Sequence, residues 1–262
     1  MRTIYSMFFG AVALALAPTS GFAATCGGDF GSWLQGVKQE APSHGVGPRG
    51  LAALDGLSPD PSVISHDRGQ GVFRQTFEQF GPHRVAPLLG AGANKLRAMG
   101  SFFSQLESQT GVPGPVLVAI WGLETSYGAV QGNFNTIRSL ATLAHDCRRA
   151  EKFRDELFSA LKIVDSGAMT ASSMRGAWAG EIGQTQFMAS SYLKFGGGRD
   201  LIGSSQAALT ATANYLRGYG WTKGAGWEPG QPNFAVIKEW NKSDVYARTI
   251  AYFATKLDGM VK

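Results

Sequence analysis

Apolar residues recur at intervals close to 3.6 residues through most of this 262-residue chain, and this periodicity limits the fold more than any other feature. Between residues 85 and 110, for example, Leu89, Leu96, Phe103 and Leu106 would share one face of a helix. No internal repeat accompanies the pattern. The sequence therefore predicts a mainly α fold, with helices over residues 30–40, 71–80, 85–110, 116–126, 137–144, 149–166, 205–218 and 244–257.

Between the expected helices lie segments that are poor in helix formers. Ser62 to Ile64, together with Asp67, is expected to form a turn or a short extended piece. GVPGP at residues 111–115 interrupts the helical pattern, because proline can begin a helix but not sit inside it. We expect a subdomain boundary there, with an N-terminal helical subdomain over residues 25–110 and a second domain over residues 111–262. The glycine-rich segments GAWAGEIGQTQF, FGGGRD and GWTKGAGWEPGQPNF are expected to be loops, where a cleft could be lined.

The N-terminus has the pattern of a secretory signal peptide. Arg2 is followed by an apolar stretch from about Met7 to Ala17 and by small residues, which predicts cleavage near Ala23 or Ala24. No later stretch approaches the roughly 20 apolar residues of a membrane span. We therefore expect residues 1–24 to be a signal peptide and the mature protein to be soluble and periplasmic.

Cys26 and Cys147 are the two cysteines of the chain. Because an oxidising compartment favours pairing, we expect a disulfide that closes a loop of about 120 residues. Lipid attachment at Cys26 is the alternative; the residues before it, Ala23-Ala24-Thr25, fit that alternative less well.

Charge and histidine placement argue against two classes of partner. Without the signal peptide the chain would keep 23 basic and 19 acidic residues, with no basic cluster of the kind that binds nucleic acid. The four histidines are scattered and no His, Cys or Asp pair has ligand spacing, so we expect no metal and no other cofactor.

Glu124 is the most informative single residue, because it ends the apolar stretch VLVAIWGL. In a helix that begins near Gly114, Glu124 shares a buried stripe with Val116 and Ile120 and lies in the last turn before Gly128. Burial and the negative end of the helix dipole would both raise the pKa of this carboxyl, as a general acid requires. The alternative is a structural ion pair with Arg138 or Arg148.

Several features around Glu124 favour glycoside chemistry. The segment Gly180 to Phe187 combines glycines, uncharged hydrogen-bonding side chains and an aromatic, which suits sugar hydroxyl and acetamide groups. Tyrosines and tryptophans could supply flat faces for sugar rings, or simply belong to the core; they are Tyr215, Trp221, Trp227, Trp240 and Tyr246. No nucleophile motif and no phosphate-binding Gly-Lys loop is present.

Four ordered motifs together resemble those of the lytic murein transglycosylase B family: IWGLETSYG, RGAWAGEIGQTQFMASSY, ANYLRGYGW and WNKSDVYA. The similarity begins near VISHDRGQGVF and runs to the end of the chain. It implies a lysozyme-like catalytic domain at residues 111–262 and peptidoglycan glycan strands as substrate. It also implies cleavage of the β-1,4 bond between N-acetylmuramic acid and N-acetylglucosamine without water, leaving 1,6-anhydromuramoyl ends.

The resemblance also implies roles for individual residues. Glu124 would be both the catalytic acid and the catalytic base. Arg148 and Arg149 would bind carboxylates of the muropeptide or lactyl group, or else one of them would form a structural ion pair. The remaining residues implied to bind substrate are Gln186, Phe187, Tyr215, Trp240, Asn241 and Tyr246.

The sequence departs from the family pattern at three points. Ala177 stands where members often have a serine that orients the acid, and Asp200 is the single acidic residue in FGGGRDLIGS, too few for the calcium loop of some members. A C-terminal peptidoglycan-anchoring domain, common in the family, is not recognised. We therefore expect a monomer that binds through its cleft and is recruited to the wall by a protein partner.

Two other functions remain open. A lysozyme-like hydrolase would use Glu124 as acid and either Glu181 or Asp146 to activate water. A catalytically inactive glycan-binding or scaffold protein is the third candidate. The sequence does not distinguish endo from exo action, dependence on stem peptides, or wall turnover from secretion-system assembly.

Overall fold

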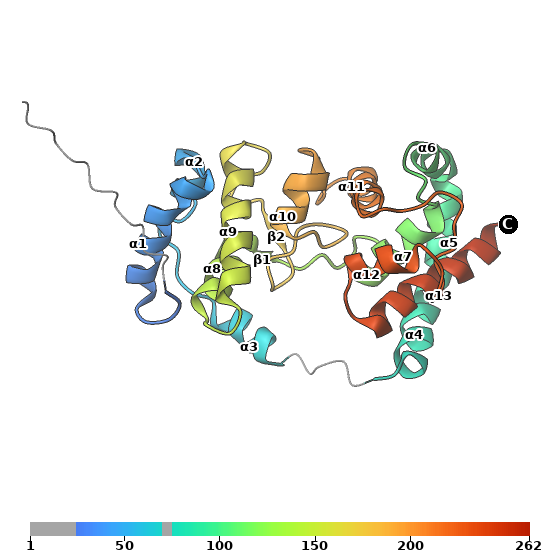
Figure 1. Ribbon diagram of the computed structural model, residues 1–262, viewed down its shortest axis with the longest axis horizontal. Coiled ribbons are helices and arrows are strands. Elements are labelled where there is room, and N and C mark those ends of the chain that lie inside the picture. The colour runs from blue at the N-terminus through green and yellow to red at the C-terminus, as the bar shows by residue number, and fades with distance from the viewer. Residues whose placement is uncertain (1–24, 70–74) are drawn as a thin grey trace, which may run out of the picture.

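The computed structural model describes residues 25–69 and 75–262 of the chain (Figure 1). The expected signal peptide and the start of the helix expected at residues 71–80 lie outside the described residues. Helices dominate, so the prediction of a mainly α fold is confirmed. The strands of the described segments are β1 (Phe134–Asn135) and β2 (Arg175–Gly176), an antiparallel pair in which Phe134 lies opposite Gly176.

The helices form two lobes that lie side by side in Figure 1. In the first, which we call the α9 lobe, α8 packs along α9, while α2 packs on α9 and α3 on α8. Leu157 and Leu161 of α9 are fully buried at its centre. Its elements are α1 (Phe30–Glu40), α2 (Pro48–Ala52), α3 (Pro61–Gly69), α8 (Thr136–His145), α9 (Ala150–Asp165) and the β1–β2 pair, with a 3-10 turn at Ala41–His44.

The second lobe, the α7 lobe, surrounds α7 (Gly114–Thr125). Every residue from Gly114 to Leu123 is buried, and α13, α5, α11 and α6 pack against this helix. The first ten residues of α7 are all apolar and need such enclosure, since they leave no face suited to water. The other elements are α4 (Phe77–Val85), a 3-10 turn (Ala86–Leu88), α5 (Leu89–Ala98), α6 (Gly100–Thr110), α11 (Ser205–Gly218), α12 (Phe234–Trp240) and α13 (Asp244–Val261).

Each lobe is built from two separate stretches of chain. The chain returns from the α7 lobe to the α9 lobe after Thr125 and leaves it again after β2. The segment that leaves the α9 lobe begins with a loop at residues 177–188. It continues with α10 (Ala189–Ser191), which contacts α9, and a π-helical turn (Tyr192–Gly196), which contacts α11.

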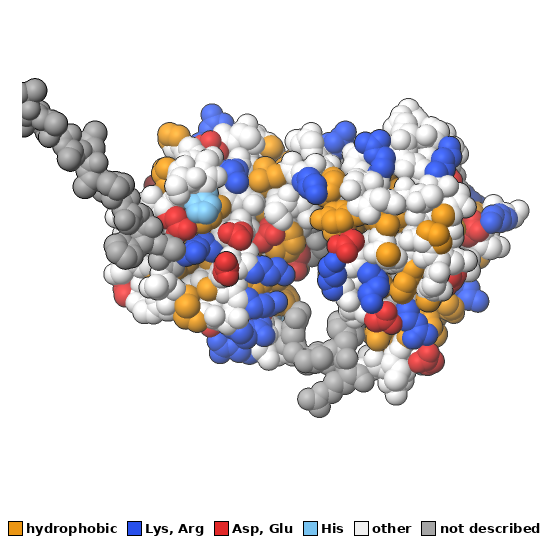
Figure 2. All heavy atoms as spheres, viewed as in Figure 1, with side chains coloured by type: hydrophobic (Ala, Val, Ile, Leu, Met, Phe, Trp, Pro, Cys, Tyr) orange, Lys and Arg blue, Asp and Glu red, His pale blue; other side chains and the backbone are white. Residues whose placement is uncertain are grey.

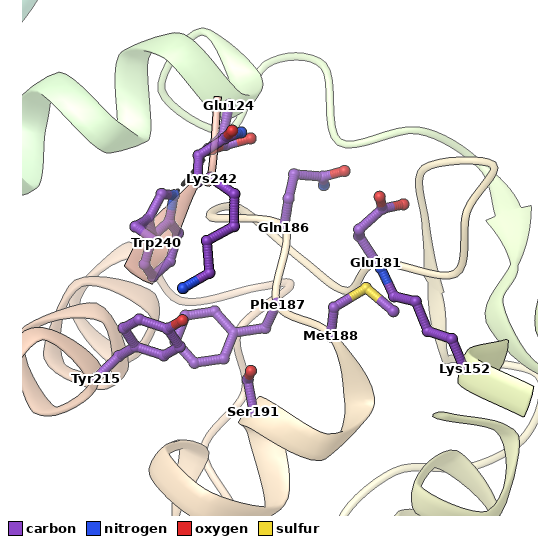
Figure 3. A pocket seen from close by; sticks show the side chains of 11 residues that line it. Glu124, Lys152, Glu181, Gln186, Phe187, Met188, Ser191, Tyr215, Trp240 and Lys242 are labelled. Carbon is purple, nitrogen blue, oxygen red and sulfur yellow. Dashed lines mark hydrogen bonds between the residues drawn. The ribbon is translucent and has the colours of Figure 1, made fainter. Parts of the chain in front are cut away.

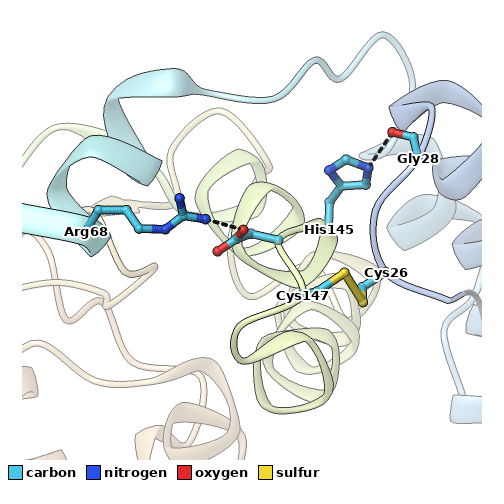
Figure 4. The surroundings of a disulfide bond; sticks show 6 residues. Cys26, Gly28, Arg68, His145 and Cys147 are labelled. Atoms are coloured by element: carbon cyan, nitrogen blue, oxygen red, sulfur yellow. Dashed lines mark hydrogen bonds and ion pairs between the residues drawn. A yellow bond between two sulfur atoms is a disulfide. The ribbon is translucent and has the colours of Figure 1, made fainter.

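Cys26 and Cys147 form a disulfide, with their Cα atoms 5.1 Å apart and 121 positions apart in the sequence. The bond ties the segment before α1 to the segment that joins α8 to α9 (Figure 4). Close to it, the His145 ring lies 3.2 Å from the Gly28 carbonyl oxygen, and Arg68 pairs with Asp146 at 2.6 Å. The expected pairing therefore fixes the N-terminal end of α9.

Four expectations about local structure are wrong. The helix expected at residues 71–80 does not end at Phe80, because α4 continues to Val85 with Pro82 inside it. Residues 62–67 are helical, because Asp60 accepts a hydrogen bond from the Ser62 N–H and Pro61 begins α3. The helix expected at residues 85–110 is broken at Met99, where φ is −113° and ψ 24°, and its first residues form the 3-10 turn. The third glycine-rich segment was expected to be a loop up to Phe234, and α12, which was not predicted, begins at that residue.

The division at residues 110 and 111 stays a prediction. Helices from the two sides of this boundary pack together in both lobes. In the α7 lobe, α4 to α6 pack on α7, α11 and α13; in the α9 lobe, α1 to α3 lie with α8 and α9.

Lysine and arginine side chains are interspersed with aspartate and glutamate on the face shown in Figure 2. Within residues 25–69 and 75–262, no helix is both long enough and apolar enough to cross a bilayer.

Candidate active site

The end of α7 is attached to the loop at residues 177–188 by buried hydrogen bonds. The Trp121 indole N–H donates to Gln184 Oε1 at 3.0 Å, and the Thr125 hydroxyl donates to the Gln184 carbonyl oxygen at 2.5 Å. Thr125 Oγ1 in turn accepts from the Gly128 N–H at 2.9 Å. The first two motifs singled out in the sequence, ETSYG and GQTQF, therefore lie against each other and bring Glu124 next to Gln186.

Both motifs contain strained backbone. In the described segments, the non-glycine residues with positive φ are Ser126 (50°), Tyr127 (63°) and Gln186 (55°). Such conformations persist where surrounding contacts hold them, and they concentrate at functional sites. Here the Tyr127 hydroxyl donates to the Leu88 carbonyl oxygen at 2.7 Å, and the Gln186 amide donates to the carbonyl oxygens of Gln131 (3.1 Å) and Gly183 (2.7 Å).

A close backbone approach fixes the loop itself. A Cβ atom at Gly176 would lie 1.7 Å from the Glu181 carbonyl oxygen, so only glycine allows the loop to fold back at this point. The Ile182 N–H and the Phe187 carbonyl oxygen then join in a bridge at 2.8 Å, which turns residues 183–186 toward α7.

These segments enclose a pocket of about 390 Å³ where the two lobes meet (Figure 3). Glu124 and Trp240 lie at one end, Glu181 and Lys152 at the other, and Gln186 and Phe187 between them. The residues that line it are Glu124, Lys152, Glu181, Gln186, Phe187, Met188, Ser191, Tyr215, Trp240, Asn241 and Lys242. Of the residues predicted to bind substrate, the pocket thus includes Gln186, Phe187, Tyr215, Trp240 and Asn241.

Glu124 is held by neutral hydrogen-bond donors. The Trp240 indole N–H donates to Glu124 Oε1 at 3.0 Å, and the Tyr246 hydroxyl donates to the same carboxyl group. The pKa of Glu124 is raised to about 7, chiefly by burial and to a smaller extent by the nearby charge of Glu181. The hydrogen bonds from Trp240 and Tyr246 and the charge of Arg84 act in the opposite direction and limit the rise. Glu124 forms no ion pair with any residue of the described segments.

The structural ion pair considered for Glu124 is not formed. Arg138 instead lies 3.5 Å from Asp60 and donates to the carbonyl oxygens of Ser58 and Pro59, and Arg148 pairs with Asp67. Arg84 donates to the Leu123 carbonyl oxygen at 3.1 Å, at the last turn of α7, and so acts on Glu124 only at longer range.

The unpredicted helix α12 places Trp240 beside Glu124. Trp240 is its last residue, and the Asn241 side chain accepts the Ser243 N–H at 3.0 Å while Ser243 caps α13. Tyr246 therefore enters from the first turn of α13. The WNKSDVYA motif is thus a tight connection between two helices, and both of its aromatic residues reach the carboxyl group.

Phe187 and Tyr215 form the floor beneath Trp240. Their rings meet the Trp240 ring edge to face, at centroid distances of 5.4 Å and 5.0 Å. The Tyr215 hydroxyl donates to the Glu239 carbonyl oxygen at 2.8 Å, so it holds α12 rather than reaching toward Glu124. Trp221 and Trp227, also considered as sugar-stacking faces, do not line this pocket: Trp221 is buried and bonds the Gly111 carbonyl oxygen.

Arg148 and Arg149 do not line the pocket and both pair with Asp67 of α3. Burial alone would raise the pKa of Asp67, but the hydrogen bonds and charges of the two arginines outweigh it and lower the pKa. The structure therefore shows the ion pair, formed by both arginines, and their binding of substrate carboxylates stays a prediction.

The two residues at which the sequence departs from the family pattern, Ala177 and Asp200, lie outside the pocket. Ala177 does not line the pocket, and its carbonyl oxygen accepts the Gly180 N–H at 3.1 Å inside the loop. Asp200 uses its carboxylate to accept the N–H groups of Ile202 and Gly203 at 3.0 Å and 2.8 Å.

Sequence reasoning missed Lys152, Met188, Ser191 and Lys242, and it considered Glu181 only for the hydrolase alternative. Three of these five residues, Glu181, Met188 and Ser191, belong to the segment EIGQTQFMASS. The length of this segment could therefore have indicated that more of its residues line the site than Gln186 and Phe187.

Comparison with known proteins agrees with this arrangement. The family described as "Transglycosylase SLT domain" matches residues 29–231. Among curated proteins, the membrane-bound lytic murein transglycosylase B of Escherichia coli (strain K12) is 35% identical over 136 residues. That alignment covers 47% of this chain and 38% of the relative, so the matched part spans well under half of the relative's length.

Solved structures are similar over most of the chain. SltB3 from Pseudomonas aeruginosa, in complex with NAG-NAM-pentapeptide, has a TM-score of 0.82 and 28% identity, covering 89% of this chain and 80% of that one. The Escherichia coli lytic transglycosylase Slt35, in complex with bulgecin A, has a TM-score of 0.75 at 23% identity, covering 94% and 99%, which is evidence for a shared fold. The fold is therefore that of the lysozyme-like lytic transglycosylases, and the chain belongs to the transglycosylase SLT domain family.

Proposed function

We propose that the protein is a lytic transglycosylase of peptidoglycan. It would cleave the β-1,4 bond between N-acetylmuramic acid and N-acetylglucosamine and leave 1,6-anhydromuramoyl ends. The observation that carries this proposal is Glu124, a largely buried carboxyl group in a pocket, held by two neutral donors, with a pKa near 7. The relatives support it, because SltB3 is described in complex with NAG-NAM-pentapeptide and with NAG-anhNAM-pentapeptide.

In the first step, protonated Glu124 gives its proton to the glycosidic oxygen as the bond from that oxygen to C1 of the muramoyl unit breaks. Burial supports this role, because it keeps the carboxyl protonated to a pH where a free glutamic acid is ionised. The acetamide of the muramoyl unit would stabilise the positive charge that develops at C1, as in substrate-assisted glycosidases.

In the second step, the Glu124 carboxylate takes the proton of the C6 hydroxyl of the same muramoyl unit while O6 bonds to C1. The 1,6-anhydro bond closes and Glu124 regains its proton, so one group completes the cycle. The Trp240 and Tyr246 donors favour the ionised form that this step needs, and the attacking hydroxyl is held on the substrate itself.

The surroundings of Glu124 suit a neutral glycan. Gln186, Phe187, Tyr215, Trp240, Asn241 and Tyr246 would contact the sugar units or hold the residues that do. The disulfide fits export, and we propose a periplasmic, cofactor-free monomer that a protein partner brings to the cell wall.

A hydrolase is the second candidate, because Glu181 lines the same pocket as Glu124. A hydrolase needs a second, ionised carboxylate to activate water. Glu181 lies at the opposite end of the pocket from Glu124, with Gln186 and Phe187 between them, which is a poor position for activating a water at the bond that Glu124 protonates. Asp146, the other residue considered for this role, pairs with Arg68 at 2.6 Å and does not line the pocket.

Digestion of purified peptidoglycan sacculi, followed by mass spectrometry of the new chain ends, tests the proposal. Wild-type protein and the Glu181→Gln and Asp146→Asn variants should all produce anhydro ends. Reducing ends from the wild type, lost in Glu181→Gln, would establish the hydrolase instead. No cleavage by folded protein would favour a glycan-binding role.

A further inference from the structure

Glu181 is a pocket residue whose carboxyl group is left incompletely bonded. Its Oε2 atom is buried and finds no hydrogen-bond partner in the part of the chain that the structure describes. Glu181 lines the pocket at the end opposite Trp240, on the far side of Gln186 from Glu124 (Figure 3). A buried acceptor without a partner is costly, so at the edge of a pocket such an atom is expected to be completed by a donor that enters the pocket, from water or from a ligand.

A second carboxylate in the same region behaves differently. Glu156 of α9 is buried, and its two oxygens accept the Ser190 N–H at 2.9 Å and the Ser190 hydroxyl at 2.6 Å. Glu156 therefore completes its bonding inside the protein and anchors α10, beside the pocket. Within the described residues, the carboxyl group of Glu181 accepts only from backbone N–H groups of its own loop, those of Ala179 and Glu181, and its Oε2 atom is left without a partner.

The charges around Glu181 limit what it can bind. Lys152 and Arg149 lie close enough to favour its ionised form, but Arg149 is already paired with Asp67. An additional cation at this end of the pocket would be repelled by both. A carboxylate or phosphate of the ligand would be repelled by Glu181 itself. The remaining partner for Oε2 is a neutral hydrogen-bond donor, an O–H or an amide N–H.

We propose that Glu181 is a substrate-binding residue, whose Oε2 accepts a hydrogen bond from a hydroxyl or secondary amide N–H of the glycan strand at the α9 end of the pocket. This proposal rests on the proposed function, since it takes a peptidoglycan strand as the occupant. It gives Glu181 a role in holding the strand and none in the proton transfers of Glu124.

Binding, measured without turnover, tests the role of Glu181 independently of the reaction products. In a Glu124→Gln background, the affinity for purified glycan strands is compared with and without Glu181→Met, which keeps the length of the side chain and removes its oxygens. We expect binding about 10- to 100-fold weaker, the usual effect of losing a hydrogen bond to a charged group. Asp146→Asn in the same background is the control for a carboxylate outside the pocket and should leave the affinity unchanged.

Thermal stability separates binding from a structural role. Because Glu181→Met removes an unsatisfied buried oxygen, its melting temperature should equal or exceed that of the parent. Glu181→Gln keeps a carbonyl acceptor and should recover part of the affinity. Unchanged binding by Glu181→Met would overturn the proposal, and so would weaker binding accompanied by a large fall in melting temperature.

Two substrates identify the donor. Strands with intact stem peptides and strands stripped of them by an amidase are compared in the same assay. A loss on both places the donor on a sugar, whereas a loss only on peptide-bearing strands identifies a peptide N–H. Failure of wild-type protein to form anhydro ends would refute the proposed function, and the binding comparison would still stand by itself.

Discussion

Glu124 and Asp67 are both carboxylates withdrawn from solvent, and the protein treats them in opposite ways. Asp67, in the α9 lobe, is paired with Arg148 and Arg149, and its pKa is lowered. Glu124, at the end of α7, is offered only the neutral donors of Trp240 and Tyr246, and its pKa is raised to about 7. Burial opposes ionisation at both positions, so the neighbours decide the outcome.

The difference distinguishes a structural charge from a chemical one. A buried charge with two full counter-charges stays ionised and fixes the elements around it, here α3 against the start of α9. A buried carboxyl without a counter-charge can gain and lose a proton near neutral pH. Removing the Glu124 carboxyl group should therefore affect activity, whereas removing the Asp67 carboxylate should affect stability.

The largest effect is expected on activity. Glu124→Gln keeps the shape of the side chain and loses its titratable proton, so cleavage of sacculi should fall at least about 1,000-fold. Folding should be preserved, as judged by circular dichroism and the melting temperature. Substantial residual cleavage by Glu124→Gln would mean that another residue supplies the acid.

The next effect is expected on stability. Asp67→Asn leaves two arginines without their carboxylate, and because both arginines are partly exposed we expect a loss of about 2 to 3 kcal/mol of unfolding free energy. This corresponds to a fall in melting temperature of about 5 to 10 °C by calorimetry. Asp55→Asn, which removes the exposed partner of Lys38, is the matched control and should cost under about 0.5 kcal/mol. If Asp67→Asn lost activity without losing stability, Asp67 would belong to the site.

The two acids should also give stability profiles of opposite sign with pH. The raised pKa of Glu124 means that the folded state binds more protons than the unfolded state, so its contribution is lost as pH rises from 4.5 through 7. The unfolding free energy of Glu124→Gln should therefore exceed that of the wild type by about 3 kcal/mol at pH 8 and equal it near pH 4. The contribution of Asp67 is lost instead as pH falls below 3.8. Denaturant titrations at several pH values measure both, and identical profiles would remove the distinction.

The smallest effect concerns the neutral donors. Trp240→Phe removes the indole N–H that bonds Glu124 Oε1, and Tyr246→Phe removes the phenolic donor. Each change should raise the pKa of Glu124 further, moving the pH dependence of kcat/KM upward by about one unit. A profile that moved downward, or not at all, would show that these bonds do not favour the ionised form.

The sequence predicted most helices because their apolar faces repeat within single elements. It predicted Glu124 for a related reason, because an acid at the end of an apolar stretch can be recognised from the sequence alone. The hydrogen bond between Trp240 and Glu124 could not be recognised in this way. Trp240 lies 116 positions away, on a helix whose start falls within a glycine-rich segment. Its orientation depends on packing against Phe187 and Tyr215, which local sequence does not encode.

The ion pair that was one alternative for the arginines could be found only in three dimensions. Asp67 was assigned to a turn, so it was not considered as a partner for Arg148 and Arg149. Once residues 61–69 form a helix, Val63 and Asp67 share its buried face and the carboxylate reaches both guanidinium groups. The error in local structure therefore concealed the ion pair.

Because each lobe combines two distant stretches of chain, synthesis from the N-terminus completes them at different times. The α9 lobe has all its elements once β2 has emerged, whereas the α7 lobe waits for α13, the helix that contacts α7 and α4 most extensively. Until then the apolar surface of α7 has no cover from that side. A chain that ends before residue 244, or whose last helix has not yet emerged into the compartment where it folds, would thus expose the hydrophobic surface of α7 and be the form most prone to aggregation.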